Sequence, residues 1–583
     1  MSENPKHFYE FGEYLLDPFE WRLLRGGQVI PLTPKAFETL CLLVENGGHL
    51  LEKNRLMEML WADAFVEEGN LADNISKIRQ ALGDSRKEPK FIETVSGRGY
   101  RFVGEVKESA SKNADAMEEE RGAAIKSLAV LPFKPLLTGE RDEFLEMGIA
   151  DTLITGLSGI GQIIVRPISA IRKYADPSQD PLAAGRKLKV DAVLAGSVQK
   201  YGERLRVNVR LLSVRDESTL WADKFDENFT DIFTLQDSIS EKVVAALSLK
   251  LTNEGKQRLT KRHTENPEVH QLFLKCRYYW HKWTPEGWQK SIEYGSQAIS
   301  LDPTHAPSYS WVGASYCTLS IVGILTPKEA FSKARELVEK ALSLDPTLSK
   351  AHEVLGAIKL FYEWDLASAA DSLKRAIELN PSNATARDLY AVYLTAIGQT
   401  DAAVSEVKQA LEVDPLSLII NTNMGKMLYS ARRYQQAAEQ LQRTLDLDPY
   451  FAQACYVLGF VYLQEGRFDE AIAEINKAVV LSGRDAASSA ELGFAYAVAG
   501  QCQEAREVLA TLEKHSKHGY VDPYHMALIH IGLRDKNQAF EWLGKACSER
   551  SQEIIFLKSN PIYDPLRSDP RFMGLLQRAG LVL

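Results

Sequence analysis

Between positions 70 and 101 the apolar residues follow first a helical and then a strand period. The helical stripe recurs at spacings of four, three and four residues and consists of Leu71, Ile75, Ile78 and Leu82. Gly83 follows this stripe, and glycine is the residue that most readily ends a helix. The segments FIETV and YRFV then alternate apolar and polar residues on either side of Ser96-Gly97-Arg98-Gly99. The pattern therefore predicts a helix, a charged turn and a glycine-tipped β-hairpin.

Upstream of this stretch, the pattern predicts short strands and two more helices. FYEFGEYLLD, WRLLRGG and QVIPL alternate like the strands of a small antiparallel sheet. Thr33-Pro34 has the residues of a helix N-terminus, and this helix is expected to end at Asn46-Gly47-Gly48. A second helix is expected from about Lys53 to Trp61. Residues 6–104 are thus predicted to form one small domain of sheet, three helices and hairpin.

Residues 125–252 show a different alternation of strands and helices. SLAVLPF, IIVRP and AVLAGSVQKY have the composition of strands, and two more strands are expected at 203–214 and 218–225. Amphipathic helices are expected at 143–157, 181–188 and 235–251. Gly156, Gly159 and Gly161 lack the lysine and Ser/Thr of a phosphate-binding loop. We therefore expect a structural or ligand-sensing α/β domain that holds no catalytic, cofactor or metal site.

From residue 265 to 583 the sequence repeats itself. The segment ends ALSLDP, AIELNP, ALEVDP, TLDLDP and AVVLSG align, and their turn residues (Pro346, Pro381, Pro415, Pro449 and Gly483) stand 35, 34, 34 and 34 positions apart. An earlier unit ends at Pro303, so the 43-residue step to Pro346 indicates an insertion near residues 319–326. About eight helix pairs are expected, with NPIYDPLRSDPRFMGLLQRAGL as a cap that buries Phe572 and Leu575-Leu576.

An aromatic cluster stands near the start of this array. It consists of Tyr278-Tyr279-Trp280, Trp283 and Trp288. Packing between the first helices and a patch for a binding partner are both compatible with this pattern.

The charge distribution supports nucleic-acid binding only locally. The whole chain carries a formal net charge of −9, and residues 1–105 hold 17 acidic against 13 basic residues. Between Lys77 and Arg101, however, seven basic residues stand against three acidic ones. The basic residues are therefore gathered on the predicted helix and hairpin, where a DNA backbone would be contacted.

The segments LTPKAFETLCLLVENGG, NLADNISKIRQALGD and FIETVSGRGYRFV resemble the winged-helix effector domain of the OmpR/PhoB-type response regulators. The resemblance covers residues 6–104 and implies a third helix in the DNA major groove, with the wing in the adjacent minor groove. Carried over by position, the helix contacts are Asn70, Asp73, Asn74, Ser76, Lys77 and Arg79, and those of the wing are Thr94, Ser96, Arg98 and Tyr100. The family often has Arg or His where Asp73 and Ser76 stand, and commonly a basic residue at the position of Ser96.

Two further resemblances cover the rest of the chain. LAVLPF, DAVLAGSV and LW…F resemble the TolB amino-terminal-like domain, which implies no catalysis, and the repeats resemble tetratricopeptide repeats. Between the first two domains, KESASKNADAMEEERG predicts a solvated linker over residues 105–124. Some relatives of the CadC type have a transmembrane helix after the winged helix, whereas this chain contains no run of 18 or more apolar residues.

The expected fold is multidomain α+β, with a winged helix-turn-helix at 6–104, an α/β domain at 125–252 and an all-α tetratricopeptide solenoid at 265–583. The expected function is that of a cytoplasmic, sequence-specific DNA-binding transcription regulator, not an enzyme, whose C-terminal two-thirds sense or dock a partner. The alternative is a protein-interaction scaffold whose winged helix no longer binds DNA, and Asp73 and Ser96 favour it. The expected partners are double-stranded promoter DNA and a protein or peptide on the repeat array. A homodimer is left open, and no membrane is expected.

Overall fold

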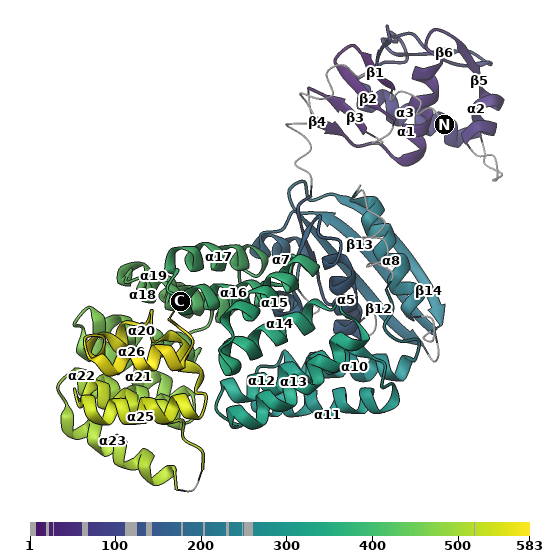
Figure 1. Cartoon of the computed structure of the whole chain (residues 1–583). Helices are drawn as coiled ribbons and strands as arrows, with labels where there is room; N and C mark the ends of the chain where they lie inside the picture. Colours follow the sequence, from purple (N-terminus) through teal and green to yellow (C-terminus); the bar gives the residue numbers. More distant parts are fainter. Residues whose placement is uncertain are drawn as a thin grey trace. The chain divides into compact units, whose positions relative to one another are not determined.

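The computed structural model divides into two compact units, residues 1–124 and 125–583, which are described separately. It describes residues 7–18, 22–26, 28–60, 68–110, 125–135, 143–176, 179–201, 204–228, 232–247, 249, 261–517 and 519–582. Figure 1 shows the chain coloured along its sequence.

The first unit begins with an antiparallel sheet, as the alternating pattern predicts. Its strands, in the order β4-β3-β2-β1-β8, are β1 (His7–Phe11), β2 (Tyr14–Asp17), β3 (Arg22–Arg25), β4 (Gln28–Ile30) and β8 (Lys107–Ala110). Strand β8 was not predicted, because Lys107 to Ala110 carries no apolar alternation and was assigned to the linker. These residues pair with β1 from His7↔Ala110 to Glu10↔Lys107. The domain therefore continues beyond the hairpin to residue 110.

Three helices and a second small sheet complete this unit. The helices are α1 (Pro34–Glu45), α2 (Lys53–Leu60) and α3 (Glu68–Leu82), as predicted for the parts that the structure describes. The hairpin forms from β6 (Ile92–Val95) and β7 (Gly99–Phe102), and β5 (Leu50–Glu52) pairs with β7. Trp61 lies outside the described residues. The core of the unit gathers apolar side chains from all three helices and both sheets.

The second unit begins with a mixed six-stranded sheet. Its strands are β9 (Ser127–Val130), β10 (Lys134–Pro135), β11 (Ile164–Val165), β12 (Ala192–Tyr201), β13 (Arg204–Ser213) and β14 (Thr219–Asn228). They run in the order β11-β9-β12-β13-β14, with β10 beside β12. Strands β11, β9 and β12 are parallel, whereas β13 and β14 are antiparallel neighbours. The predicted strands of residues 127–228 are confirmed.

Helices pack against this sheet, and the first four helical segments connect its parallel strands. They are α5 (Glu143–Ser158), α6 (Ile168–Ile171), η1 (Arg172–Tyr174), α7 (Pro181–Leu188) and α8 (Ile232–Ala246). Helix α8 contacts both α5 and β14. Helices α5, α7 and α8 were predicted, while α6 and η1 were not, because ISAIRKY is too short to show a helical period.

Eight helix pairs follow between residues 267 and 548, as the repeat count predicts. They are α10 (Pro267–Trp280) with α11 (Pro285–Leu301), α12 (Ala306–Ile321) with α13 (Pro327–Leu344), α14 (Ser349–Ile358) and η3 (Lys359–Glu363) with α15 (Leu366–Leu379), α16 (Ala384–Ala396) with α17 (Thr400–Val413), α18 (Leu418–Ser430) with α19 (Tyr434–Leu447), α20 (Ala452–Gln464) with α21 (Phe468–Leu481), α22 (Ala486–Val498) with α23 (Cys502–His515), and α24 (Pro523–Gly532) with α25 (Lys536–Ser548). Gly459 shows why the repeat needs a small residue, because a Cβ there would lie 2.4 Å from Ile475 Cγ1.

The C-terminal segment, residues 549–582, does more than cover the last repeat. It contains η4 (Gln552–Phe556), η5 (Pro561–Leu566) and α26 (Pro570–Arg578). Phe572 and Leu575 are buried as predicted. Ile554, Ile555 and Tyr563 are fully buried in the same core as the repeats.

Contacts of the C-terminal segment reach far back along the chain, to turns inside earlier repeats. Gln552 Nε2 donates to the carbonyl oxygen of Ile321, the last residue of α12, at 2.9 Å. The Arg550 guanidinium lies 4.4 Å from the Trp364 ring centre, in the turn before α15. Arg432, in the turn before α19, donates two hydrogen bonds to the Asp564 carboxylate at 2.7 and 2.9 Å. The segment therefore joins the eighth repeat to the second, third and fifth.

The aromatic cluster at the start of the array divides between core and surface. Trp280 and Trp288 are buried, which confirms the core interpretation for these two side chains. Trp283 is 44% exposed and contacts both of them, with ring centres 5.8 and 5.7 Å away.

Candidate nucleic-acid interface

Helix α3 is fixed to the first unit by one apolar face. Leu71, Ile75, Ile78 and Leu82 are all buried, as their spacing predicts. Gly83 then takes a φ of +60°, and the Asp84 carboxylate accepts hydrogen bonds from the backbone N–H groups of Lys90, Phe91 and Ile92. Asp84 thereby fixes the turn between α3 and the wing, a role that was not predicted from the sequence.

The opposite face of α3 presents a polar stripe to solvent. Asp73, Ser76, Lys77 and Gln80 are exposed at the spacing of successive helical turns, and Asn70 is exposed one turn earlier. Lys77 Nζ lies 2.7 Å from Asp73 Oδ2, so the lysine charge on this face is paired with a carboxylate. Gln80 was not among the predicted contact residues, although the same helical period places it on this stripe.

Asn74 lies on the flank of α3, as its spacing predicts, but its side chain does not reach the exposed stripe where its predicted DNA contact would lie. Its side chain is 6% exposed, and its Nδ2 donates to Thr39 Oγ1 of α1 at 3.5 Å. The amide is therefore turned into the domain, where it joins α3 to α1. Helical spacing alone placed Asn74 at the flank of the apolar face, and a polar side chain there was wrongly assigned to the groove.

Arg79 is also turned inward, toward the wing. Its Nη2 donates to Ile92 O at 2.7 Å and to Thr94 Oγ1 at 2.8 Å, so Arg79 and Thr94 join α3 to β6. Burial lowers the pKa of the Arg79 guanidinium from its ordinary value, while the Asp84 carboxylate raises it. Both residues were predicted to contact DNA, whereas their described hydrogen bonds fix the hairpin against the helix.

The wing exposes a single arginine at its tip. Gly97 has a φ of +72°, and a Cβ on Gly99 would lie 2.0 Å from Leu51 O, so both glycines are required by the turn. Between them, Arg98 is exposed together with Ser96. Tyr100 is 7% exposed and lies in the core, which is a correction to its predicted place among the contacts. The exposed part of the candidate interface thus consists of the polar stripe of α3 and the tip of the wing.

A second site lies within the second unit, where the α/β domain contacts the repeats. Arg166 follows β11 and donates from Nε to Leu188 O at 2.9 Å and from Nη2 to Lys189 O at 2.7 Å, at the end of α7. Its Nη1 donates to Val413 O at 3.0 Å and to Glu412 O, at the end of α17. One guanidinium therefore donates to the C-terminal carbonyls of two helices. The C-terminal end of a helix carries partial negative charge, which stabilises a cation there.

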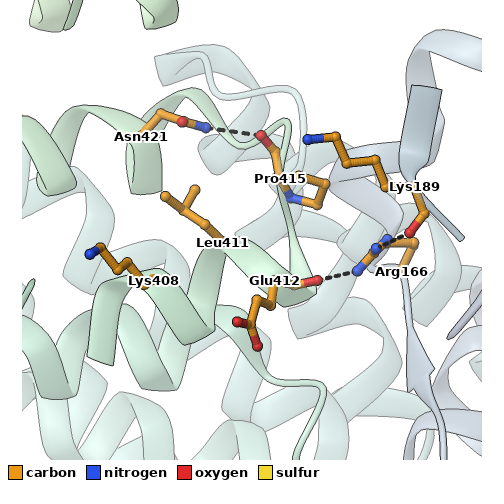
Figure 2. Close-up of a pocket in the computed structure, with 7 residues that line it drawn as sticks. All are labelled: Arg166, Lys189, Lys408, Leu411, Glu412, Pro415 and Asn421. Atoms are coloured by element: carbon orange, nitrogen blue, oxygen red, sulfur yellow. Dashed lines mark hydrogen bonds between the residues drawn. The ribbon is translucent and has the colours of Figure 1, made fainter. Parts of the chain in front are cut away.

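An open cavity of about 430 Å³ adjoins Arg166. It is lined by Arg166, Lys189, Lys408, Leu411, Glu412, Pro415 and Asn421. Figure 2 shows the Arg166 guanidinium directed at the Glu412 carbonyl, so this side chain joins the two domains and also lines the cavity. Burial lowers the pKa of Arg166, and the carboxylates of Asp414 and Asp191 raise it.

Three more contacts hold this junction. Ser169 Oγ donates to Asp414 Oδ2 at 2.6 Å, and the Val165 N–H donates to Ser382 Oγ at 3.1 Å. Arg277 of α10 donates to Asp151 Oδ1 at 2.6 Å. The α/β domain therefore contacts the first repeat and the loops that precede α16 and α18.

Among the described residues, no helix is both long enough and apolar enough to span a bilayer.

Three parts of the chain match known protein families. Residues 27–102 match the family "Transcriptional regulatory protein, C terminal", and residues 428–480 match "Tetratricopeptide repeat". Residues 124–242 match "HilA/YgeH-like transcriptional regulator, second domain". The predicted winged helix and repeats are confirmed. The resemblance of the middle domain to the TolB family is not confirmed, because the match there is to the HilA/YgeH-like family.

Names among the similar proteins include those of transcriptional regulators and that of an enzyme. Transcriptional regulator HilA of Salmonella typhimurium is 25% identical over 401 residues, which cover 68% of this chain and 68% of HilA. Transcriptional activator CadC of Escherichia coli is 28% identical over 93 residues, 16% of this chain and 18% of CadC. "Putative adenylate cyclase 3" of Rhizobium meliloti is 27% identical over 198 residues, 34% of this chain and 32% of that protein.

The second of the matched families carries the name of the first of these relatives. The winged helix is followed directly by a domain of the HilA/YgeH-like type, and the repeats come last. The chain is therefore a homologue of HilA- and CadC-like transcriptional regulators, with an OmpR/PhoB-type DNA-binding domain at its N-terminus and tetratricopeptide repeats at its C-terminus.

Proposed function

We propose that this chain binds specific promoter DNA through the exposed stripe of α3 and the tip of its wing. The observation that carries the proposal is the common exposure of Ser76, Lys77, Gln80 and Arg98 on a helix and hairpin that are otherwise fixed by buried contacts. A rigid helix with polar side chains suits the major groove, and an arginine on an adjacent hairpin suits a phosphate or the minor groove.

The corrected positions change the roles that the family resemblance implies. Asn70, Asp73, Ser76, Lys77, Gln80, Ser96 and Arg98 remain candidates for DNA contact. Asn74, Arg79, Thr94 and Tyr100 support the shape of the interface from inside. Such a division is expected of a precise site, because groups that touch the ligand must be held by others that do not.

The proposal gives the rest of the chain a regulatory role. Repeats of this type present long surfaces for other proteins, so a protein or peptide partner on residues 267–548 is the proposed input. A second copy of the chain is one such partner. The matched families are those of regulators and repeats, so no catalytic activity is assigned. The proposed place of action is the cytoplasm, where bacterial DNA lies.

Binding to DNA is tested by selecting sequences from a random duplex library with the full chain. Lys77→Ala and Arg98→Ala should each weaken binding to the selected sequence. Each should also lower the slope of log affinity against log salt concentration by about one unit, as expected for the loss of one phosphate contact. Lys340→Ala, an exposed lysine on α13, is the matched control and should leave both quantities unchanged. Unchanged binding by both test variants would overturn the groove assignment.

A second function is favoured by the pairing of Lys77 with Asp73. Because this carboxylate lies on the same exposed face, it repels phosphates and neutralises the helix cation. The alternative is therefore a protein-interaction scaffold whose winged helix does not bind DNA. Failure of the full chain to enrich any sequence, together with normal folding, would favour the scaffold.

A further inference from the structure

The sheet of the α/β domain has one face that remains open to solvent at its antiparallel end. Along β13, Leu205, Val207 and Val209 are buried in the core shared with α8, so the alternate side chains face the other way. These alternate positions are Arg204, Arg206, Asn208 and Arg210, and the three arginines are exposed.

Strand pairing extends this face across both neighbours of β13. On β12, Arg204 pairs with Tyr201, Arg206 with Gln199, Asn208 with Ser197 and Arg210 with Ala195. On β14, Arg204 pairs with Asn228, Arg206 with Asp226, Asn208 with Lys224 and Arg210 with Ala222. Residues directly opposite each other project on the same side of a sheet. The rows from Arg206 to Arg210 therefore share one side of the sheet, and we call this side, together with Arg204, the basic sheet face.

Positive charge dominates the basic sheet face. Among the described side chains of these rows, Arg204, Arg206, Arg210 and Lys224 are cationic, and Asp226 alone carries a carboxylate. Asp226 accepts from Arg206 at 2.6 Å and lies 3.8 Å from Arg204, and both arginine side chains remain about half exposed or more, at 45% and 68%. A cationic surface of this kind runs against the chain as a whole, which carries a net charge of −9.

We propose that the basic sheet face binds the phosphate backbone of double-stranded DNA beside the site held by the winged helix. This inference rests on the proposed function and assigns the second domain a sequence-independent share of it. Successive residues on one side of a strand are about 6.7 Å apart, so Arg204 to Arg210 spans roughly 20 Å. A duplex carries one charge per about 1.7 Å of axis, so several phosphates fall within that length.

The covalent connection keeps this face within reach of the same duplex. The first unit ends its last strand at Ala110, and the second begins at Ile125. The chain between these residues can span at most about 50 Å. Once the winged helix is bound, the basic sheet face therefore meets DNA at a high effective concentration, and individually weak phosphate contacts add to the affinity.

The test uses the full chain with Arg204, Arg206 and Arg210 all replaced by glutamine. Glutamine retains hydrogen-bonding capacity but removes three charges from the basic sheet face. The matched control replaces Lys340, Arg443 and Lys514, which are exposed on three different repeats, by glutamine. Binding to a random-sequence duplex several helical turns long is measured by fluorescence anisotropy between about 50 and 200 mM salt. Thermal unfolding verifies that both variants fold.

The test variant should bind the long duplex at least about tenfold more weakly than the parent, with a salt slope lower by roughly 2–3 units. The control should match the parent. On a duplex cut to the winged-helix footprint, the difference between parent and test variant should shrink. The inference would be overturned if the test variant and the parent had equal affinity and equal salt slope on the long duplex. It would also be overturned if the test variant lost only self-association, as measured by sedimentation. Absence of DNA binding by the parent would instead refute the proposed function.

Discussion

Lys77 and Asp73 form an ion pair on the exposed face of α3, with Nζ and Oδ2 2.7 Å apart. The carboxylate lies where a DNA phosphate would approach, so it opposes binding while holding the lysine. Asp73→Asn should therefore tighten DNA binding about fivefold, since a Coulomb interaction of about 1 kcal/mol is expected at 4 Å in water. Helix stability should fall by no more than about 0.5 kcal/mol.

Affinity of the full chain for its selected sequence measures this effect. Glu58→Gln, which removes an exposed carboxylate from α2, is the control and should change affinity little. Weaker binding by Asp73→Asn would show that the carboxylate accepts a hydrogen bond from a base instead of repelling the backbone.

Asn74 should contribute to the stability of the first unit, and Gln80 should contribute to DNA binding. Asn74→Ala removes a buried hydrogen bond to Thr39, so the free energy of unfolding of the first unit should fall by about 1 kcal/mol. The preferred DNA sequence should stay the same. Gln80→Ala should leave unfolding unchanged and weaken binding or relax the preference at one base pair. Denaturation of residues 1–124 and sequence selection with the full chain provide the two measurements.

The first unit should require strand β8 for full stability. Residues 1–124 should fold alone, because they form a compact unit with its own core. This fragment should bind DNA, but more weakly than the full chain does. A fragment of residues 1–105 lacks the partner of β1 and should be less stable by roughly 2 kcal/mol, from lost ladder hydrogen bonds worth about 1 kcal/mol each. Urea denaturation of both fragments compares them, and equal midpoints would show that β8 contributes nothing.

Asp388 should make the stability of the repeats depend on pH. Burial raises the pKa of this carboxyl to about 7, while a hydrogen bond from Asn423 and the charge of Lys426 lower it. The folded state therefore holds the proton more tightly than the unfolded state, and the stability that this gives is lost as pH rises from about 4 to about 7. Asp388→Asn stays neutral throughout, so it should be increasingly stable relative to the parent over that range, by on the order of a few kcal/mol.

Calorimetry of the full chain at several pH values checks this expectation. Asp371→Asn, an exposed position on α15, should shift the unfolding temperature equally at each pH. A difference between parent and Asp388→Asn that does not grow with pH would contradict the expected proton uptake.

The elements that the sequence predicted well are those whose signal is local. The stripe from Leu71 to Leu82 faces the core because its spacing matches a helix, and Gly97 has positive φ because the turn demands it. Asn74 escaped prediction because its position borders the apolar face, where only the contact with Thr39 shows which way the amide turns. Strand β8 was not predicted because Lys107 to Ala110 is held by backbone pairing with β1. Backbone hydrogen bonds do not depend on the pattern of apolar and polar side chains.

Long-range contacts were beyond any local signal. The pairing of Arg432 with Asp564 and the insertion of Arg166 between two helix ends join residues more than a hundred positions apart. Arginine and aspartate occur throughout the surface of this chain, so these particular partners cannot be distinguished from solvated charges by sequence pattern.

The return of the C-terminal segment to the second, third and fifth repeats has a consequence for biosynthesis. A linear solenoid can fold repeat by repeat as it leaves the ribosome, because each unit needs only its neighbour. Here the surfaces around Ile321, Trp364 and Arg432 await residues 550–564, which are synthesised more than a hundred codons later. The array therefore completes its folding only after its last residues have been synthesised. A chain truncated near residue 548 would leave the ribosome with exposed apolar surface that chaperones and proteases recognise.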